Sequence, residues 1–351
     1  MIQIRGLKVH YPLRRSFSDV LAGRSALLVR AVDGLDLDLE RGEIVALVGE
    51  SGSGKTTTGR ALTRLAPITD GHVTLEGREV TAIGGRELGA YRRRVQIIFQ
   101  DPYESLDPRR AVHEQVAEPL LVQGIGTGPE RREKVDRALE DAGLRPAAAF
   151  RDRYPHELSG GQRQRVAIAS AMVLEPDVLV ADEPVSMRDV SLRSGILRVM
   201  LDLRERRGIG ILFITHDLSL AWLIAERIAV MYLGRIVEVG SAETLVRDPR
   251  HPYTKALLSV MPSPDPARRR RRVILHGETP DPSRIPKGCR FHTRCPLVFD
   301  RCRVEDPPDF PVGDGRLAAC WLAEGGQPLP DFPIYEKREN VAEVEAEVPP
   351  P

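Results

Sequence analysis

Hydrophobic and polar positions alternate over short stretches in the first 100 residues, as they do in half-buried β-strands. This alternation, or a short continuous apolar run, predicts strands at Ile2–Val9, Ala31–Leu39, Glu43–Val48, His72–Leu75 and Val95–Phe99. A helix is expected at Lys55–Leu65. Between residues 112 and 174 the period lengthens to that of amphipathic helices, which predicts helices at Val112–Gln123, Glu130–Ala142 and from near Ser159.

Strands and helices alternate again in the stretch that follows. The predicted strands are Val178–Ala181, Ile211–Ile214 and Ile228–Tyr232, and the predicted helices are Ser191–Arg206 and Leu218–Glu226. The simplest interpretation is an α/β fold, in which a sheet core with helices carries a helical insertion between Gln100 and Asp182.

The length of 351 residues allows two or three domains of roughly 100–200 residues each. We expect a core domain at residues 1–260, with its helical part at about 101–175, followed by a Pro/Arg-rich linker at 261–272. A small Cys-rich module is expected at 273–325 and an acidic disordered tail at 326–351. The polar and basic residues 12–29 are expected to form a hairpin insertion.

The net charge of +1 gives no global field for nucleic acid, which weighs against a genome-binding role. No apolar run approaches the ~18–20 residues that span a bilayer. Residues 1–5 carry charge where a signal peptide needs an apolar segment. We therefore expect a cytoplasmic protein that reaches a membrane only through a partner.

A glycine-rich loop lies between the predicted strand at 43–48 and the predicted helix at 55–65. It reads Gly49-x-x-x-x-Gly54-Lys55-Thr56, a spacing at which backbone N–H groups surround phosphates. Lys55 is expected to contact the β- and γ-phosphates of ATP, and Thr56 is expected to bind Mg²⁺. The other loop residues expected at the nucleotide are Ser51, Gly52, Ser53 and Thr57.

Two carboxylates follow the apolar strand at 178–181. Asp182 is expected to bind Mg²⁺, and Glu183 is the candidate general base for the water that attacks ATP. His216 follows the next strand and is the candidate sensor of the γ-phosphate. Alone, such residues are more often surface carboxylates or hydrogen-bonded histidines; the glycine-rich loop upstream favours the catalytic interpretation.

A third motif, Leu158-Ser159-Gly160-Gly161-Gln162, opens a predicted helix. Ser159 is expected to cap this helix. Glycine in a first turn costs about 0.5–1 kcal/mol, which is understandable if the bare amides contact a phosphate. Because the helical insertion separates this motif from its own phosphate loop, the expected ligand is ATP held by a partner subunit.

Taken together, these motifs resemble the nucleotide-binding subunit of an ABC transporter over about residues 1–263. The resemblance implies the Walker A, signature, Walker B and H-loop motifs, with a Q-loop at Gln100 that helps to bind Mg²⁺. It also implies that Tyr11 stacks on adenine and that Asp189 contacts the partner's ATP site. Arg188 stands where this family usually has an apolar residue, which puts equal activity of the two ATP sites in question.

Residues 100–108, 251–258 and 277–282 resemble the oligopeptide/dipeptide (peptide/nickel) importer subfamily. The resemblance implies a second, related ATPase subunit, two permease subunits whose coupling helix contacts Gln100, and an extracytoplasmic solute-binding protein. It places the chain at the cytoplasmic face of the cell membrane. Oligosaccharides and nickel complexes remain alternative cargoes. Two other functions are less favoured. A soluble ABC-type ATPase acting on nucleic acid or ribosomes usually has two cassettes per chain, whereas this chain shows one. An exporter is normally fused to a membrane domain, for which this sequence shows no apolar span.

All four cysteines lie in the last fifth of the chain, which in a reducing cytosol indicates metal before disulfide. Their spacing lacks the C-x₂-C knuckles of a zinc ribbon and suits a four-thiolate iron–sulfur cluster better, at Cys289, Cys295, Cys302 and Cys320. Buried free thiols are the alternative. The resemblance adds weight to a [4Fe–4S] cluster, since some peptide-importer ATPases carry one. Zn²⁺, with His292 as a spare ligand, is the second choice of metal.

Overall fold

The computed structural model describes residues 1–13, 27–101, 106–185, 190–261 and 273–330, with the main chain alone at 190–192. These residues form two sheets. The smaller sheet is antiparallel in the order β2-β1-β4-β5 and contains β1 (Ile2–Pro12), β2 (Leu28–Leu39), β4 (Asp70–Leu75) and β5 (Arg78–Glu79). Among the described residues, no helix is long and apolar enough to span a bilayer.

The larger sheet has the order β11-β12-β10-β9-β3-β8-β7-β6. Its central strands are parallel: β9 (Arg227–Tyr232), β3 (Ile44–Val48), β8 (Gly210–Thr215), β7 (Val178–Asp182) and β6 (Val95–Ile98). Every residue of β3, β7 and β8 is buried, which explains why these strands are continuous apolar runs. Because parallel strands end at one edge, the loops after β3, β6, β7 and β8 meet there.

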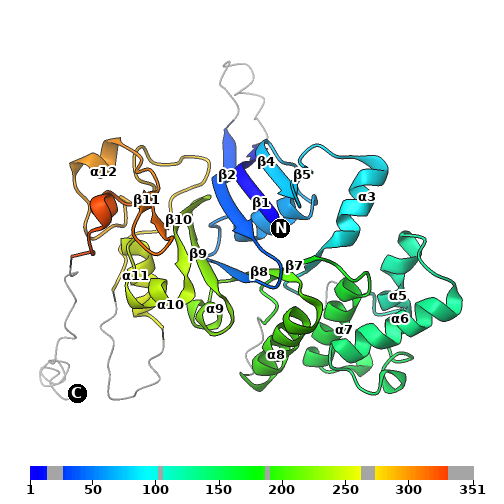
Figure 1. Cartoon of the computed structure of the whole chain (residues 1–351). Helices are drawn as coiled ribbons and strands as arrows, with labels where there is room; N and C mark the ends of the chain where they lie inside the picture. Colours follow the sequence, from blue (N-terminus) through cyan, green and yellow to red (C-terminus); the bar gives the residue numbers. More distant parts are fainter. Residues whose placement is uncertain (14–26, 102–105, 186–189, 262–272, 331–351) are drawn as a thin grey trace, which may run out of the picture.

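Helices enclose this sheet. The core helices are α2 (Lys55–Leu62), α3 (Gly85–Arg94), α8 (Val190–Arg207) and α9 (Leu218–Ile224). The expected helical insertion between β6 and β7 is confirmed as α5 (Val112–Val122), α6 (Gly128–Asp141) and α7 (Gly160–Met172). Figure 1 places this insertion at one end of the molecule and the C-terminal segment at the other, with the sheet between them.

The C-terminal segment is built onto the core sheet. It contains α10 (Ala242–Arg247), α11 (Pro252–Ser259), α12 (Asp300–Val304) and the short strands β11 (Phe310–Pro311) and β12 (Leu317–Ala318). β12 pairs antiparallel with β10 (Arg235–Ser241), so the C-terminal segment extends the sheet that holds the glycine-rich loop. Phe291 is fully buried in the main core, and its ring centroid lies 5.4 Å from that of Tyr253 in α11.

The predicted fold is confirmed, but several elements were not predicted from the sequence: α3, α10, α11, α12, β5, β10, β11 and β12. The predicted end of α9 at Glu226 is wrong. Ala225 is extended, and Glu226 pairs with the start of β3 through Ile44 at both backbone and side chain. The predicted hairpin at 12–29 has its base in the pairing of Pro12 with Leu28, while residues 14–26 lie outside the described part. Residues 262–272 of the predicted linker (261–272) and residues 331–351 of the predicted tail (326–351) also lie outside it.

Candidate functional site

The loop after β3 is shaped by two glycines that tolerate no side chain. A Cβ on Gly49 would lie 2.2 Å from the carbonyl oxygen of Met231. A Cβ on Gly54 would lie 2.1 Å from the carbonyl oxygen of Ala31, and Gly54 has a φ of 108°, which favours glycine. β9 and β2 therefore press against the loop from behind, and α2 begins directly after it with its N-terminus facing the loop.

Lys55, the first residue of α2, is buried in the curve of this loop. Its Nζ donates to the carbonyl oxygens of Gly49 and Glu50 at 2.8 Å each. Burial lowers the pKa of the Lys55 ammonium, and the nearby carboxylates of Glu183, Asp182 and Glu50 partly oppose that shift. The ammonium group of Lys55 therefore lies at the centre of the loop that was predicted to bind phosphates. Of the other predicted loop contacts, Ser53 is buried and Ser51 is exposed.

Thr56 and Asp182 form the predicted Mg²⁺ pair. The Thr56 hydroxyl donates to Asp182 Oδ1 at 3.1 Å, joining α2 to the end of β7. Burial raises the pKa of the Asp182 carboxyl, the hydroxyl of Thr56 opposes the rise, and the charge of Glu183 adds to it. Hydroxyl and carboxylate oxygens are the ligands that a hard cation such as Mg²⁺ accepts, so the donor chemistry fits this ion.

Glu183, Gln100 and His216 are brought together from the ends of three strands. Gln100 Nε2 donates to Glu183 Oε2 at 2.9 Å, and His216 Nδ1 lies 3.1 Å from Glu183 Oε1. The backbone N–H of Glu183 donates to the carbonyl of Ile214 in β8, and its φ of 47° is unusual for a non-glycine residue. The candidate base is therefore fixed on three sides in a strained main-chain conformation, a feature that clusters at functional sites.

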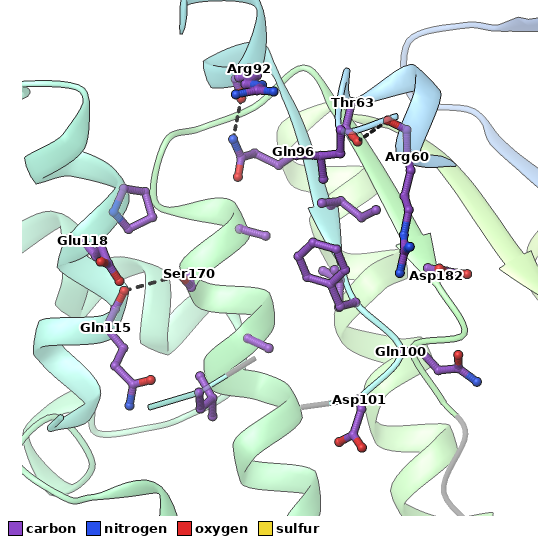
Figure 2. A pocket seen from close by; sticks show the side chains of 18 of the residues that line it. Arg60, Thr63, Arg92, Gln96, Gln100, Asp101, Gln115, Glu118, Ser170 and Asp182 are labelled. Atoms are coloured by element: carbon purple, nitrogen blue, oxygen red, sulfur yellow. Dashed lines mark hydrogen bonds between the residues drawn. The ribbon is translucent and has the colours of Figure 1, made fainter. Parts of the chain in front are cut away.

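A cleft of about 1380 Å³ separates these residues from the helical insertion. Figure 2 shows Glu118 and Ser170 on the helical side, and Gln100 and Asp182 on the sheet side. Thr56 also lines the cleft, so the predicted Mg²⁺ ligands open directly into it. The resemblance implied that Gln100 and the residues after it contact a coupling helix of the permease; of these, residues 102–105 lie outside the described part.

The signature motif begins α7 as predicted, and the expected cap at Ser159 is confirmed. Its hydroxyl accepts from the backbone N–H of Gln162 at 3.3 Å, and Gln162 Oε1 accepts from the backbone N–H of Ser159 at 3.0 Å. This capping box leaves Gly160 and Gly161 in the first turn. Tyr11 lies near the end of β1 with 37% of its surface exposed, available for a flat ligand. Arg188 and Asp189 lie outside the described residues.

The cysteines are free thiols that line one cavity together with His251 and His292. The cavity is small, with a volume of about 10 Å³. Burial raises the pKa of Cys289 to about 11 and those of Cys295 and Cys320 to about 12, and neighbouring cysteines add to each shift. Within the described ranges, no three His, Cys, Asp or Glu side chains are placed to hold one metal ion. The predicted metal centre therefore gains no direct support from this geometry.

Residues 32–186 match the model of the ABC transporter family, and residues 237–302 match that of the oligopeptide/dipeptide transporter C-terminal region. A Brucella ovis protein named for ATP binding in peptide import is 47% identical over 91% of this chain and 97% of its own length. The chain belongs to the ABC transporter family. The dipeptide transport ATP-binding protein DppF of Haemophilus influenzae is 45% identical over 90% of this chain and 94% of that protein.

Solved structures agree with this assignment. The dimeric ATP-binding cassette MJ0796 in a post-hydrolysis state with ADP and Pi has a TM-score of 0.60 at 28% identity, covering 69% of this chain and 99% of that one. The cbiO1 cassette from Clostridium perfringens has a TM-score of 0.59 at 27% identity, covering 70% of this chain and 90% of that one. The enzymatic activity of this ABC family member is ATP hydrolysis.

Residues of the C-terminal segment contact the loop in ways that the sequence did not reveal. Glu50, inside the loop, is bound by Thr279, Arg294 and the hydroxyl of Tyr253. The sequence marked the stretches around Tyr253 and Thr279 through the subfamily resemblance, but it carried no signal that either would reach a residue more than 200 positions away.

Proposed function

We propose that this chain powers the import of peptides through a membrane permease. The observation that carries the proposal is the match of residues 237–302 to the oligopeptide/dipeptide transporter region, on a chain that aligns nearly end to end with relatives named for peptide import. Oligosaccharides and nickel complexes are the alternative cargoes. A role on nucleic acid or ribosomes is not favoured, since the net charge is only +1.

In the proposed site, the loop amides and Lys55 bind the β- and γ-phosphates. Thr56, Gln100 and Asp182 would hold Mg²⁺, which when bound neutralises charge on the phosphates. Glu183 accepts a proton from the attacking water at a carboxylate oxygen, and its contacts with Gln100 and His216 are consistent with a base held in a fixed orientation. Tyr11, Gly49, Ser51, Gly52, Ser53, Gly54 and Thr57 complete the proposed nucleotide contacts.

The second half of each ATP site comes from another subunit in this proposal. Ser159, Gly160, Gly161, Gln162 and Asp189 contact the partner's ATP, so ATP binding closes the dimer and hydrolysis reopens it. The partner is a related but different ATPase chain. Two permease subunits and a solute-binding protein complete the importer, and the chain sits on the cytoplasmic face of the membrane. In this proposal, a permease helix contacts the residues that line the cleft beside Gln100.

We also propose a structural or regulatory [4Fe–4S] cluster at Cys289, Cys295, Cys302 and Cys320, in preference to Zn²⁺. The support is that all four cysteines face one cavity, although no three of the described ligands lie close enough for a single ion. A cluster separates its cysteines more widely than one Zn²⁺ does. Iron and sulfide measured in anaerobically purified protein test this: both should be present and lost in Cys295→Ser. Protein lacking both refutes the cluster.

The test of the transport function is a native pull-down in mild detergent, followed by peptide uptake in proteoliposomes made from the purified complex. We expect two permeases, a second ATPase and a solute-binding protein that carries peptide. Uptake should require ATP and should be lost with Lys55→Ala. A bound oligosaccharide or nickel complex would change the cargo. Ribosomal partners without a permease would overturn the transport proposal altogether.

A further inference from the structure

Glu50, the second residue of the phosphate loop, is held by the C-terminal segment. Arg294 Nη1 lies 2.8 Å from Glu50 Oε2, and Arg294 Nη2 lies 3.3 Å from Glu50 Oε1. The Thr279 hydroxyl donates to the same Oε2 at 2.9 Å. The backbone N–H of Glu50 donates to the Tyr253 hydroxyl at 2.9 Å. Three separate parts of the C-terminal segment therefore converge on one residue of the loop.

The main chain of Glu50 carries this anchoring to the phosphate site. Its carbonyl oxygen is one of the two that accept from Lys55 Nζ, at 2.8 Å. A displacement of Glu50 therefore moves an oxygen that fixes the Lys55 ammonium, and it tilts the peptide groups that follow in the loop. The side chain of Arg294 is 9% exposed and that of Glu50 is 31% exposed, so the pair is partly shielded from water and from screening by salt.

A second arginine of the same segment reaches the loop from another side. Arg290 donates to the carbonyl oxygen of Leu233 and to Asp33 Oδ2, both at 2.7 Å. The residue after Leu233 is Gly234, whose N–H donates to the carbonyl of Ser53 in the loop at 2.9 Å. The short segment that carries Cys289 and Cys295 thus braces the phosphate loop through both arginines.

We propose that Arg294 is a positioning residue for ATP binding. By holding Glu50 it keeps the loop in the conformation in which Lys55 and the loop amides face the phosphates, so in this proposal Arg294 acts through Glu50 and not on the nucleotide directly. The inference rests on the proposed ATP site at residues 49–57. In this inference the C-terminal segment strengthens nucleotide binding, and this effect does not depend on a metal bound by its cysteines.

The test is steady-state ATP hydrolysis and nucleotide titration with the full chain. Removing one charged partner of this partly shielded pair should weaken ATP binding about tenfold. Arg294→Gln and Glu50→Gln should each raise KM for ATP by that factor, with kcat at saturating ATP within about twofold of the parent. The double variant should be no worse than either single variant, because both remove the same pair. Arg294→Lys should recover part of the loss.

Arg301→Gln is the matched control, because Arg301 belongs to the same segment but pairs with Glu305 and Glu324 on the surface. Its KM should be unchanged. An unchanged KM in folded Arg294→Gln and Glu50→Gln would overturn the proposal and leave the pair a structural contact only. If Arg294→Gln fails to fold, Glu50→Gln tests the pair from the loop side. If Lys55→Ala also binds ATP normally, the proposed ATP site itself is wrong.

Discussion

His251 provides a quantitative test of how the C-terminal segment joins the core. The imidazole is fully buried, and its Nδ1 accepts from the backbone N–H of Tyr253 at 3.1 Å, which requires that nitrogen to be unprotonated. Burial lowers the pKa of His251 to about 3. An unfolded histidine has a pKa near 6.5, so below that pH the unfolded chain takes up a proton that the folded chain refuses. The contribution of the neutral His251 ring to the free energy of unfolding is therefore fully present above pH 6.5 and is lost as the pH falls toward 3.

The expected size follows from these two pKa values. At 1.36 kcal/mol per unit, lowering the pH from 7 to 5 costs about 2 kcal/mol of unfolding free energy through this residue alone. His251→Asn removes the titration but keeps a good N-cap for α11. Between pH 7 and pH 5, the unfolding free energy of His251→Asn should therefore fall by about 2 kcal/mol less than that of the parent.

Urea unfolding of both proteins at pH 7, 6 and 5 measures the effect. Taking the difference between the proteins removes titrations common to both, including that of Glu238, whose pKa burial raises to about 7. Replacing the exposed His156 with Asn provides the control for the loss of a histidine from the surface. A parent-minus-His251→Asn difference equal at pH 5 and pH 7 would refute the argument that the folded protein holds His251 neutral.

Two further changes probe the ATP site. Glu183→Gln should lower kcat by about 10²–10⁴-fold while ATP still binds, because it removes the general base. A stopped-flow hydrolysis assay measures this decrease. The control is Glu118→Gln, on the other side of the same cleft, which should keep nearly full activity. Gly54→Ala should destabilise the chain by about 3 kcal/mol or more, because its Cβ meets the carbonyl of Ala31 in a left-handed backbone conformation. Gly77→Ala shares the positive φ but has open space around it, so thermal unfolding should show a smaller loss; equal losses would disprove the clash.

The sequence predicted best those elements whose apolar pattern reflects full burial. β3, β7 and β8 are buried throughout, so their strand-length apolar runs were unambiguous. In contrast, α3 buries Tyr91 alone among its ten residues, and a helix that buries one side chain has no hydrophobic period to detect. β10 follows β9 through a tight turn at Leu233 and Gly234, both with positive φ, and leucine in such a turn gave no signal.

The part of the candidate site that lies at the ends of the parallel strands was predictable. Residues at the ends of β6, β7 and β8 meet because parallel strands end at one edge, so Gln100, Glu183 and His216 could be grouped from the sequence alone. The pairing of Glu50 with Arg294 could not be found in this way. It joins positions 244 residues apart, and an x position of a glycine-rich motif carries no information about its tertiary partner.

Two buried charges explain why this site should favour a metal–nucleotide complex over either ligand alone. Burial raises the pKa of Asp182 and lowers that of Lys55, so the surroundings penalise both ionised groups. A phosphate beside Lys55 supplies the missing anion, and Mg²⁺ beside Asp182 supplies the missing cation. Thr56 follows Lys55 directly and bonds Asp182, so both ligands would bind at adjacent residues. Magnesium should therefore strengthen nucleotide binding in the parent and do so much less in Asp182→Asn, a difference that titration with and without the ion measures.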